Sequence, residues 1–338
     1  MISAPAISII TPTKNRRALL RETMDSVQRQ SLDAWEHVIV DDGSDDGTAE
    51  EVLRRAEKDP RVRYIVRSGN HAGANVCRNQ GLAAALADLI VFLDSDDLLE
   101  PGCLMQRVDI MRNNRDVDFV VSRMGVFTDK FGDWGERVSA DLLGDDLLKF
   151  LFFELPWQTT GPTWRRQALE RLGGFDEDLP SWQDVDLHVR ALTAGCRYLR
   201  FAEIDYHMRW HAAADKVSLI QRRAPEHFKA AERMLVKFER VVRDGPGMTW
   251  TRQRALCSLY FCLAEFWIDA GQPKNSLRCW ALVRDRKLAS LFLHWTGFGI
   301  LMLQSAGNQG ERLGRRLGHK WKGWMRMRTD PELIVGQK

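Results

Sequence analysis

Residues 89–97 read LIVFLDSDD, an apolar run that passes directly into three carboxylates. A continuous apolar run of this length predicts a strand that is buried on both faces. Like charges crowded at its end repel one another, and burying them is costly unless they are paired or bound to a cation. The stretch therefore predicts a strand of a parallel sheet, followed by either a cation site or an acidic turn in solvent.

Three more predicted strands precede this one, at about 6–11, 36–41 and 62–68, and helical patterns separate them. Alternation of strand and helix predicts right-handed βαβ crossovers and a mostly parallel sheet with helices on both faces. In such sheets ligands bind beyond the carboxyl ends of the strands. We therefore expect the loops TPTKN (11–15), DDGSDDG (41–47) and DSDD (94–97) to converge on one crevice.

The character of the chain changes near residue 222. Two further strands are expected, in VDFVVSRMGVF (117–127) and CRYLRF (196–201), but from about Pro225 apolar residues recur only at helical spacing. We predict an α/β domain over 1–222 and a helical region over 223–338. Within the latter, residues 254–285 predict a helical hairpin that turns at AGQP.

The totals exclude several classes of protein. The 338 residues carry a formal net charge of +3, which is too small to indicate nucleic-acid binding. Six scattered cysteines without a CxxC motif predict reduced thiols and argue against a zinc site. The N-terminus lacks the basic start of a signal peptide, and the apolar stretch 288–303 is too short to span a membrane.

The carboxylates of 94–97 suit a hard divalent cation. Asp94 and Asp96 lie two residues apart and would share a face of an extended chain, whereas Asp97 would point elsewhere and help to cap the next helix. Mg²⁺ and Mn²⁺ are commonly held by one or two carboxylates together with substrate phosphates. An acidic turn with capping roles is the alternative.

A second acidic loop, VIVDDGSDDG (38–47), has the same design as the first. An aspartate at a strand end can accept hydrogen bonds from a nucleobase or a ribose. No P-loop and no GxGxxG motif follows the first strand, so phosphates would be neutralised by a metal and by basic side chains such as Arg78.

A third cluster, SWQDVDLHVR (181–190), begins a predicted helix. One of Asp184 and Asp186 would serve as its N-cap, and the other would be placed to act as a general base. Trp182 offers an apolar wall for a sugar ring or packs in the core. His211 is a further metal ligand or a structural histidine.

Taken together, these motifs resemble glycosyltransferase family 2, the inverting enzymes with a GT-A fold, from about Ile7 to Ser218. The resemblance rests on SIITPTKNR, VIVDDGSDDGT, the run from GNHAGANVCRNQG to FLDSDD, and the segment from RRQALERLGGFDEDLP to SWQDVDLHVRALTAG. The occurrence of these motifs in the right order along the chain makes the likeness specific.

The resemblance implies a role for each matching position. Asp184 would be the catalytic base and Asp96 would bind the metal that bridges the diphosphate. Beside these roles, we expect the acceptor or sugar pocket to be shaped by Trp157, Gln158, Trp182 and Gln183. The residues implied in nucleotide-sugar binding are Pro12, Thr13, Asn15, Asp42, Ser44, Arg78, Asp94 and Ser95. Two positions depart from the family pattern, with Lys14 in place of an aromatic residue and Gln183 in place of a glutamate.

The expected activity is therefore inverting, hexosyltransferase-type transfer from a nucleoside-diphosphate sugar, by family weight a UDP-sugar, to a glycan or lipid-linked acceptor. Mn²⁺ or Mg²⁺ would be the cofactor. A sugar-nucleotide nucleotidyltransferase and a non-catalytic glycan-binding or scaffold protein are the alternatives. We expect a cytoplasmic protein whose basic, tryptophan-containing segment 311–328 either contacts anionic membrane or packs on its own domain.

Overall fold

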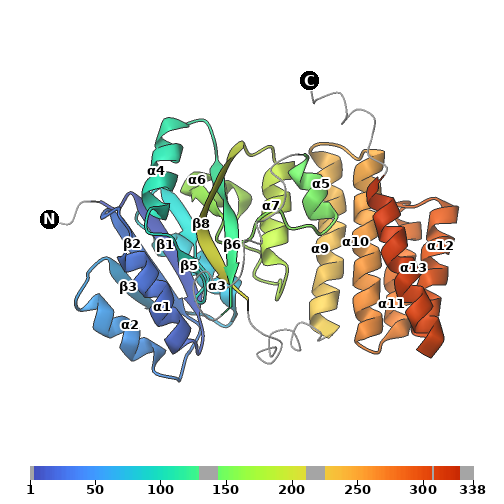
Figure 1. Ribbon diagram of the computed structural model, residues 1–338, viewed down its shortest axis with the longest axis horizontal. Coiled ribbons are helices and arrows are strands. Elements are labelled where there is room, and N and C mark those ends of the chain that lie inside the picture. Colours follow the sequence, from blue (N-terminus) through green and yellow to red (C-terminus); the bar gives the residue numbers. More distant parts are fainter. Residues whose placement is uncertain (1–3, 129–143, 211–224, 307, 328–338) are drawn as a thin grey trace. The chain divides into compact units, whose positions relative to one another are not determined.

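The computed structural model describes residues 4–128, 144–210, 225–306 and 308–327, and these form two compact units (Figure 1). The first unit consists of the described residues up to 144, together with 155–187 and 196–210. The second takes 145–154, 188–195 and the described residues from 225 onward. The second unit therefore includes two short stretches that the sequence had assigned to the α/β part.

A sheet forms the centre of the first unit. Its strands are β1 (Ile7–Thr13), β2 (Trp35–Asp41), β3 (Val62–Val66), β4 (Leu89–Phe92), β5 (Leu98–Leu99), β6 (Phe119–Phe127), β7 (Pro162–Arg165) and β8 (Tyr198–Arg209). They lie side by side in the order β3-β2-β1-β4-β7-β6-β8-β5. The strands β1, β2 and β4 are buried along their whole length, which agrees with their continuous apolar sequences.

Strand direction changes once the sheet passes β4. The strands β3, β2, β1 and β4 are parallel, as predicted, but β7 pairs antiparallel with both β4 and β6, and β5 pairs antiparallel with β8. The predicted fold class is confirmed, with a sheet that is mixed over its second half. Because β5 and β7 hold two and four residues, they carry too little periodicity to be found in the sequence.

Helices of the first unit are α1 (Arg17–Gln28), α2 (Thr48–Ala56), α3 (Ala74–Ala84), α4 (Cys103–Asn113), α6 (Arg166–Leu172) and the first residues of α7 (Gln183–Thr193). The helix α3 lies very close to β1, since a Cβ added at Gly81 would lie 2.3 Å from Cγ2 of Ile10. This close approach fixes the height of α3 over the sheet.

A buried ion pair holds the far half of the sheet. The guanidinium of Arg107, on α4, donates from Nε and Nη2 to the two carboxylate oxygens of Asp205, on β8, both at 2.7 Å. It also donates to the backbone carbonyl of Thr160 at 2.9 Å. A buried bidentate pair of this kind constrains both elements strongly, because removal of one partner would leave a buried charge.

The second unit is helical. It comprises α5 (Asp146–Leu151), the last residues of α7, α9 (Pro225–Asp244), α10 (Trp250–Asp269), α11 (Pro273–Asp285), α12 (Leu291–Ser305) and α13 (Asn308–Met327). The helix α10 packs against five of the others, and its Phe261 contacts the buried ring of Trp280. The predicted hairpin is confirmed as α10 and α11, with Gly271 at φ +71° and Pro273 as the first helical residue.

Two further expectations concern the whole chain. In the described residues none of the helices is long and apolar enough to cross a membrane. All six cysteines are described and none forms a disulfide, as predicted. Burial raises the pKa of every one of these thiols, to about 12 at Cys77 and to about 11 at Cys262.

Candidate active site

The neighbouring strands β2, β1 and β4 are parallel, so their carboxyl ends bring the predicted loops together at one end of the sheet. The first two loops are bonded to each other. The backbone N–H of Asn15 donates to Oγ of Ser44, and the N–H of Asp45 donates to Oδ1 of Asn15, both at 2.9 Å. Asn15 adopts a left-handed conformation with φ +51°, which asparagine tolerates better than most residues. The expected convergence of these loops is therefore present.

Asp42 lies between the two loops, beside two cationic side chains. The guanidinium of Arg67 donates to its Oδ1, the N–H of Gly73 donates to the same oxygen at 3.2 Å, and the ammonium of Lys14 lies 3.7 Å from Oδ2. Lys14, which departs from the family pattern, thus pairs with the aspartate that is expected at the nucleobase. The neighbouring Asp41 instead shapes the loop, because it accepts hydrogen bonds from Ser44 and, at 2.7 Å, from the hydroxyl of Tyr64.

Arg78 pairs with Asp94, and its charge also acts on Asp184, which is far away in the sequence. Its side chain is only 3% exposed, and Nη2 donates to Oδ1 of Asp94 at 2.6 Å. Asp184 lies in the first turn of α7, and the charges of Arg78 and Asp94 both act on its pKa. Burial raises the pKa of Asp184, the N–H of Val185 and the guanidinium of Arg78 oppose that rise, and the charge of Asp94 adds to it. The expected base is therefore influenced by the charges of Arg78 and of the expected ribose contact, Asp94.

The helix α3 also holds the segment that leads to Asp184. Nδ2 of Asn75 donates to the carbonyls of Asp176 and Leu179 at 2.9 and 2.8 Å, while its Oδ1 accepts from Arg78 at 3.2 Å. One turn later, Asn79 exchanges two hydrogen bonds of 2.9 Å with the backbone of Phe175. Neither asparagine was predicted from the sequence. Their signal was the spacing of two amides by four residues on a helix that is otherwise mostly apolar.

The carboxylates of 94–97 have separate environments. Asp96 accepts a hydrogen bond from the guanidinium of Arg16, a contact that the sequence did not suggest. Asp97 is 4% exposed and accepts from Oγ1 of Thr160 at 3.1 Å and from the N–H of Arg209 at 3.2 Å. Burial, with the charges of Asp96 and Asp94, raises the pKa of Asp97. The expectation that Asp97 caps the next helix was wrong, because its carboxylate ties this loop to β8.

Asp94 and Asp96 would supply two protein ligands to a divalent cation. The side chains of Asp94 and Asp96 are 37% and 16% exposed, so ligand can reach both. Within the part of the chain that the structure describes, three or more His, Cys, Asp or Glu side chains do not gather as a metal site. Two protein carboxylates completed by substrate phosphates and water is a usual arrangement for Mg²⁺. His211 lies outside the described residues.

Other predicted residues fall into two groups. Trp157 is 1% exposed and packs against the rings of Phe119 and Tyr198, so it is a core residue with almost no surface left for a sugar. Pro12, Thr13 and Ser95 are also buried, in or beside the strand ends. The half-buried residues near Asp184 are Trp182, at φ +61°, and Gln183. Gln158 is also half-buried.

The expected capping role in α7 was wrong. The helix starts at Gln183, so Asp184 and Asp186 both lie inside its first turn. Asp186 is fully buried, whereas Asp184 is half-buried. Of these two carboxylates, only Asp184 has surface that a ligand could contact.

Comparison with known proteins agrees with this arrangement. A family model described as Glycosyl transferase family 2 matches residues 8–173, which confirms the resemblance seen in the motifs. The putative teichuronic acid biosynthesis glycosyltransferase TuaG of Bacillus subtilis is 40% identical over 108 residues, which is 32% of this chain and 42% of that protein. The GalNAc(5)-diNAcBac-PP-undecaprenol beta-1,3-glucosyltransferase of Campylobacter jejuni is 29% identical over 44% of this chain and 49% of that protein.

These two matches span less than half the length of either curated relative. Among solved structures, S. aureus TarS 1-349 in complex with UDP-GlcNAc superposes with a TM-score of 0.60 and 16% identity, over 94% of this chain and 90% of that one. That likeness extends through the helical region and shows the fold.

Proposed function

We propose that this chain is a member of glycosyltransferase family 2 that transfers a sugar from a nucleoside-diphosphate sugar to a hydroxyl group, with inversion at the anomeric carbon. The family match over residues 8–173 and the fold shared with a UDP-GlcNAc-binding structure support the reaction class. The observation that carries the proposal is the pairing of Arg78 with Asp94 beyond the end of β4, together with the effect of both charges on the half-buried Asp184.

Asp184 is the proposed general base. Its raised pKa makes the carboxylate a better proton acceptor than an exposed aspartate, and it is half-buried beside the loops. As the acceptor hydroxyl attacks, Oδ of Asp184 takes its proton. Arg78 holds Asp94 and limits the rise of the Asp184 pKa, which favours the ionised form of the base.

The donor is held by the other loops. Asp42, with Lys14 and Arg67, faces the base of the nucleotide, and the bonded Asn15 and Ser44 keep its loop in place. Asp94 accepts from the ribose. A divalent cation held by Asp96, with Asp94 beside it, would stabilise the negative charge of the departing diphosphate. Inversion follows from a single displacement in which one carboxylate serves as base.

A donor screen tests this proposal. The purified chain would be incubated with UDP-, GDP-, CDP- and dTDP-sugars and Mn²⁺ or Mg²⁺, and release of nucleoside diphosphate would be measured with and without a simple sugar acceptor. We expect turnover with one donor, a UDP-sugar, that chelator and Asp96→Ala both abolish.

The alternatives give different products. A nucleotidyltransferase would release pyrophosphate from a nucleoside triphosphate and a sugar phosphate. A glycan-binding protein would show no release from any donor and no metal-dependent nucleotide binding in calorimetry, and that result would overturn the proposed function.

We propose that the acceptor is lipid-linked and that α12 and α13 rest on the membrane surface. The helix α12 contains no Asp, Glu, Lys or Arg, and its Phe292 and Trp295 are 75% and 59% exposed. Leu291 and Met302 on α12, and Leu313, Leu317 and Trp324 on the neighbouring α13, are exposed as well. Arg312, Arg316 and Lys320 of α13 are exposed beside them. Apolar and aromatic side chains with basic neighbours are typical of interfacial helices on anionic lipid.

Vesicle flotation tests the membrane contact. The chain should float with vesicles that contain phosphatidylglycerol and should remain in solution with vesicles of phosphatidylcholine alone. Phe292→Ser with Trp295→Ser should abolish flotation while leaving donor hydrolysis unchanged. A double variant that still floats would refute this surface, and a native chain that does not float would refute the contact.

A further inference from the structure

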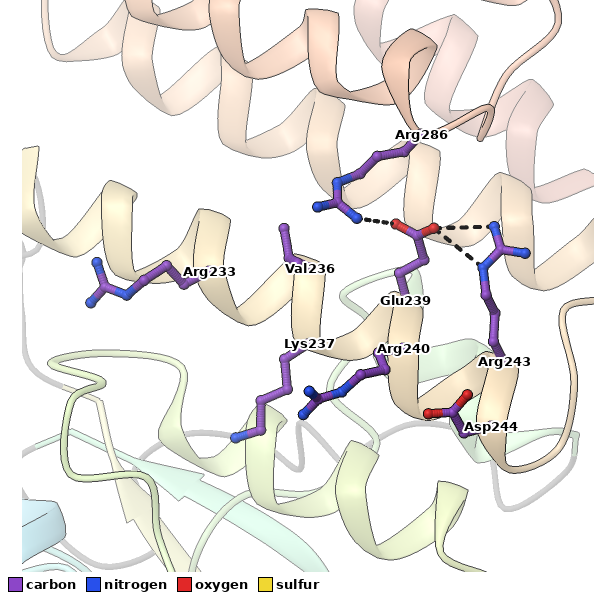
Figure 2. Close-up of a pocket in the computed structure, with 8 residues that line it drawn as sticks. All are labelled: Arg233, Val236, Lys237, Glu239, Arg240, Arg243, Asp244 and Arg286. Carbon is purple, nitrogen blue, oxygen red and sulfur yellow. Dashed lines mark hydrogen bonds and ion pairs between the residues drawn. The ribbon is translucent and has the colours of Figure 1, made fainter.

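A strongly basic pocket lies in the helical unit, away from every residue assigned above. Figure 2 shows the eight residues that line it, seven from α9 and Arg286 from the end of α11. Its volume is about 500 Å³. Five of the eight side chains are cationic and two are acidic, so the lining carries a formal charge of +3.

One of the two carboxylates is already engaged. Glu239 is 10% exposed at its side chain and accepts from Arg243 at 3.1 Å and from Arg286 at 2.9 Å (Figure 2). It therefore acts as a clamp that fixes two guanidinium groups on the wall of the pocket. Asp244 is the other acidic residue of the lining, which also contains Arg233, Lys237 and Arg240.

The basic residues follow one face of α9. Lys229 and Arg233 are four residues apart, as are Arg233 and Lys237, and Lys237 lies three residues before Arg240. Like charges at these spacings destabilise a helix by roughly 0.2–0.5 kcal/mol for each pair. A bound anion would convert this repulsion into attraction, because it would contact several of the cations at once.

Arg286 is held in a defined orientation on the wall of the pocket, because its Nη1 donates to Glu239 at 2.9 Å. Guanidinium groups held in a fixed plane match the oxygens of a phosphoryl group in pairs, which an ammonium cannot do.

We propose that this pocket binds a ligand with two or more phosphoryl groups in a row. The stretch from Arg233 to Arg243 corresponds to about 15 Å of helix, enough for successive phosphoryl groups to meet successive cations. One end of the ligand would contact Arg243 and Arg286, which Glu239 holds in place. The other end would contact Lys237 and the exposed Arg233 and Arg240. This site is separate from the proposed sugar transfer and does not depend on it.

Calorimetric titration with inorganic tripolyphosphate tests the site. The full chain would be used in EDTA and low salt, so that metal-dependent nucleotide binding does not contribute. We expect binding that weakens about tenfold or more in a variant combining Arg233→Gln, Lys237→Gln and Arg240→Gln. A matched control, Arg312→Gln with Arg316→Gln and Lys320→Gln, removes the same charge from α13 of the same unit and should retain native affinity.

Two results would overturn the proposal. The native chain would fail to bind tripolyphosphate, or both triple variants would weaken binding equally. A second arm identifies the source of the phosphoryl groups. It uses vesicles that contain diacylglycerol pyrophosphate and a chain with Phe292→Ser and Trp295→Ser, so that the surface of α12 and α13 does not contribute. If the α9 substitutions abolish tripolyphosphate binding but not vesicle binding, the ligand is soluble, whereas loss of both assigns the site to a lipid diphosphate. Donor hydrolysis should be unchanged in the α9 variant, so failure here leaves the sugar-transfer test unaffected.

Discussion

At the scale of single residues, Asp184 is the proposed catalytic carboxylate, and its surroundings act on its pKa in two directions. Burial and the charge of Asp94 raise the pKa, which strengthens the base, while the N–H of Val185 and the guanidinium of Arg78 limit that rise. The missing glutamate at position 183 removes a negative charge that would have raised this pKa further.

Asp184→Asn should therefore reduce sugar transfer by about 10²–10⁴-fold while nucleotide binding is kept, since the amide cannot accept the proton. In the native enzyme kcat should fall as the pH drops through the raised pKa of Asp184, at a higher pH than an exposed aspartate would give. Initial rates across pH 4–8 would show this limb. Transfer at the native rate in the variant would remove Asp184 as the base.

His37 provides a second residue-scale prediction. It lies buried on β2 with Nε2 2.8 Å from Oγ1 of Thr11, and burial, with the charge of Arg55, lowers its pKa to about 3. Below pH 6.5 the unfolded chain binds a proton here that the folded chain refuses, so the free energy of unfolding decreases as the pH falls from about 6.5 to about 3.

His37→Gln should remove this dependence. The native chain should lose about 2 kcal/mol at this position between pH 7.5 and pH 5, and the variant should not. Urea unfolding of both proteins at the two pH values gives the comparison. The buried His188, whose pKa is also lowered to about 3, is present in both proteins and so cancels. An equal loss in both proteins would contradict the assignment.

At the scale of elements, α3 organises the site. It packs on β1 at Gly81, carries Arg78 under the aspartates and holds the segment before α7 through Asn75 and Asn79. We regard Asn75 as a positioning residue, because it acts on the reaction only through Arg78 and through this segment.

Asn75→Ala should lower kcat about tenfold and move the acid limb of the pH profile to higher pH, because a less firmly held Arg78 would depress the Asp184 pKa less. A variant that is merely less well folded would lose activity at every pH with the limb in its native position. The two results are separated by kcat measured from pH 4 to pH 8, with circular dichroism as the control for folding.

The sequence predicted those elements whose signal is local. The strands β1, β2 and β4 could be predicted because each is a continuous apolar run, and in β2 and β4 that run passes directly into carboxylates. The contact of Arg16 with Asp96 could not, since it joins positions eighty residues apart and depends on the sheet order. The expectation that Trp157 contacts a sugar was made without knowledge of its packing, because the rings of Phe119 and Tyr198 that it contacts are distant in the sequence. The capping of α7 failed because the helix begins one residue before Asp184.

At the scale of the whole molecule, each unit has its own core. Gly81 is packed against Ile10 in the first unit, and in the second a Cβ at Gly297 would lie 2.4 Å from the ring of Trp280. Alanine at either position overpacks a core, which typically costs about 1–3 kcal/mol.

We expect two calorimetric unfolding transitions. Gly81→Ala should lower the midpoint temperature of one, and Gly297→Ala should lower that of the other. Gly323→Ala is the control, because its Cβ meets nothing within 4 Å and alanine favours a helix by up to about 1 kcal/mol over glycine. One transition that both variants shift equally would show that the units unfold together.

The six native thiols, all with raised pKa values, have a practical consequence for spectroscopy. At neutral pH they are almost entirely protonated and would react slowly with maleimides, whereas an exposed engineered cysteine would react through its larger thiolate fraction. Fluorophores could therefore be attached at Asp33→Cys in the first unit and Lys274→Cys in the second, both at exposed positions, with the native cysteines left in place. Energy transfer between the two dyes would then report, in single molecules, whether donor sugar and acceptor change the distance between the units.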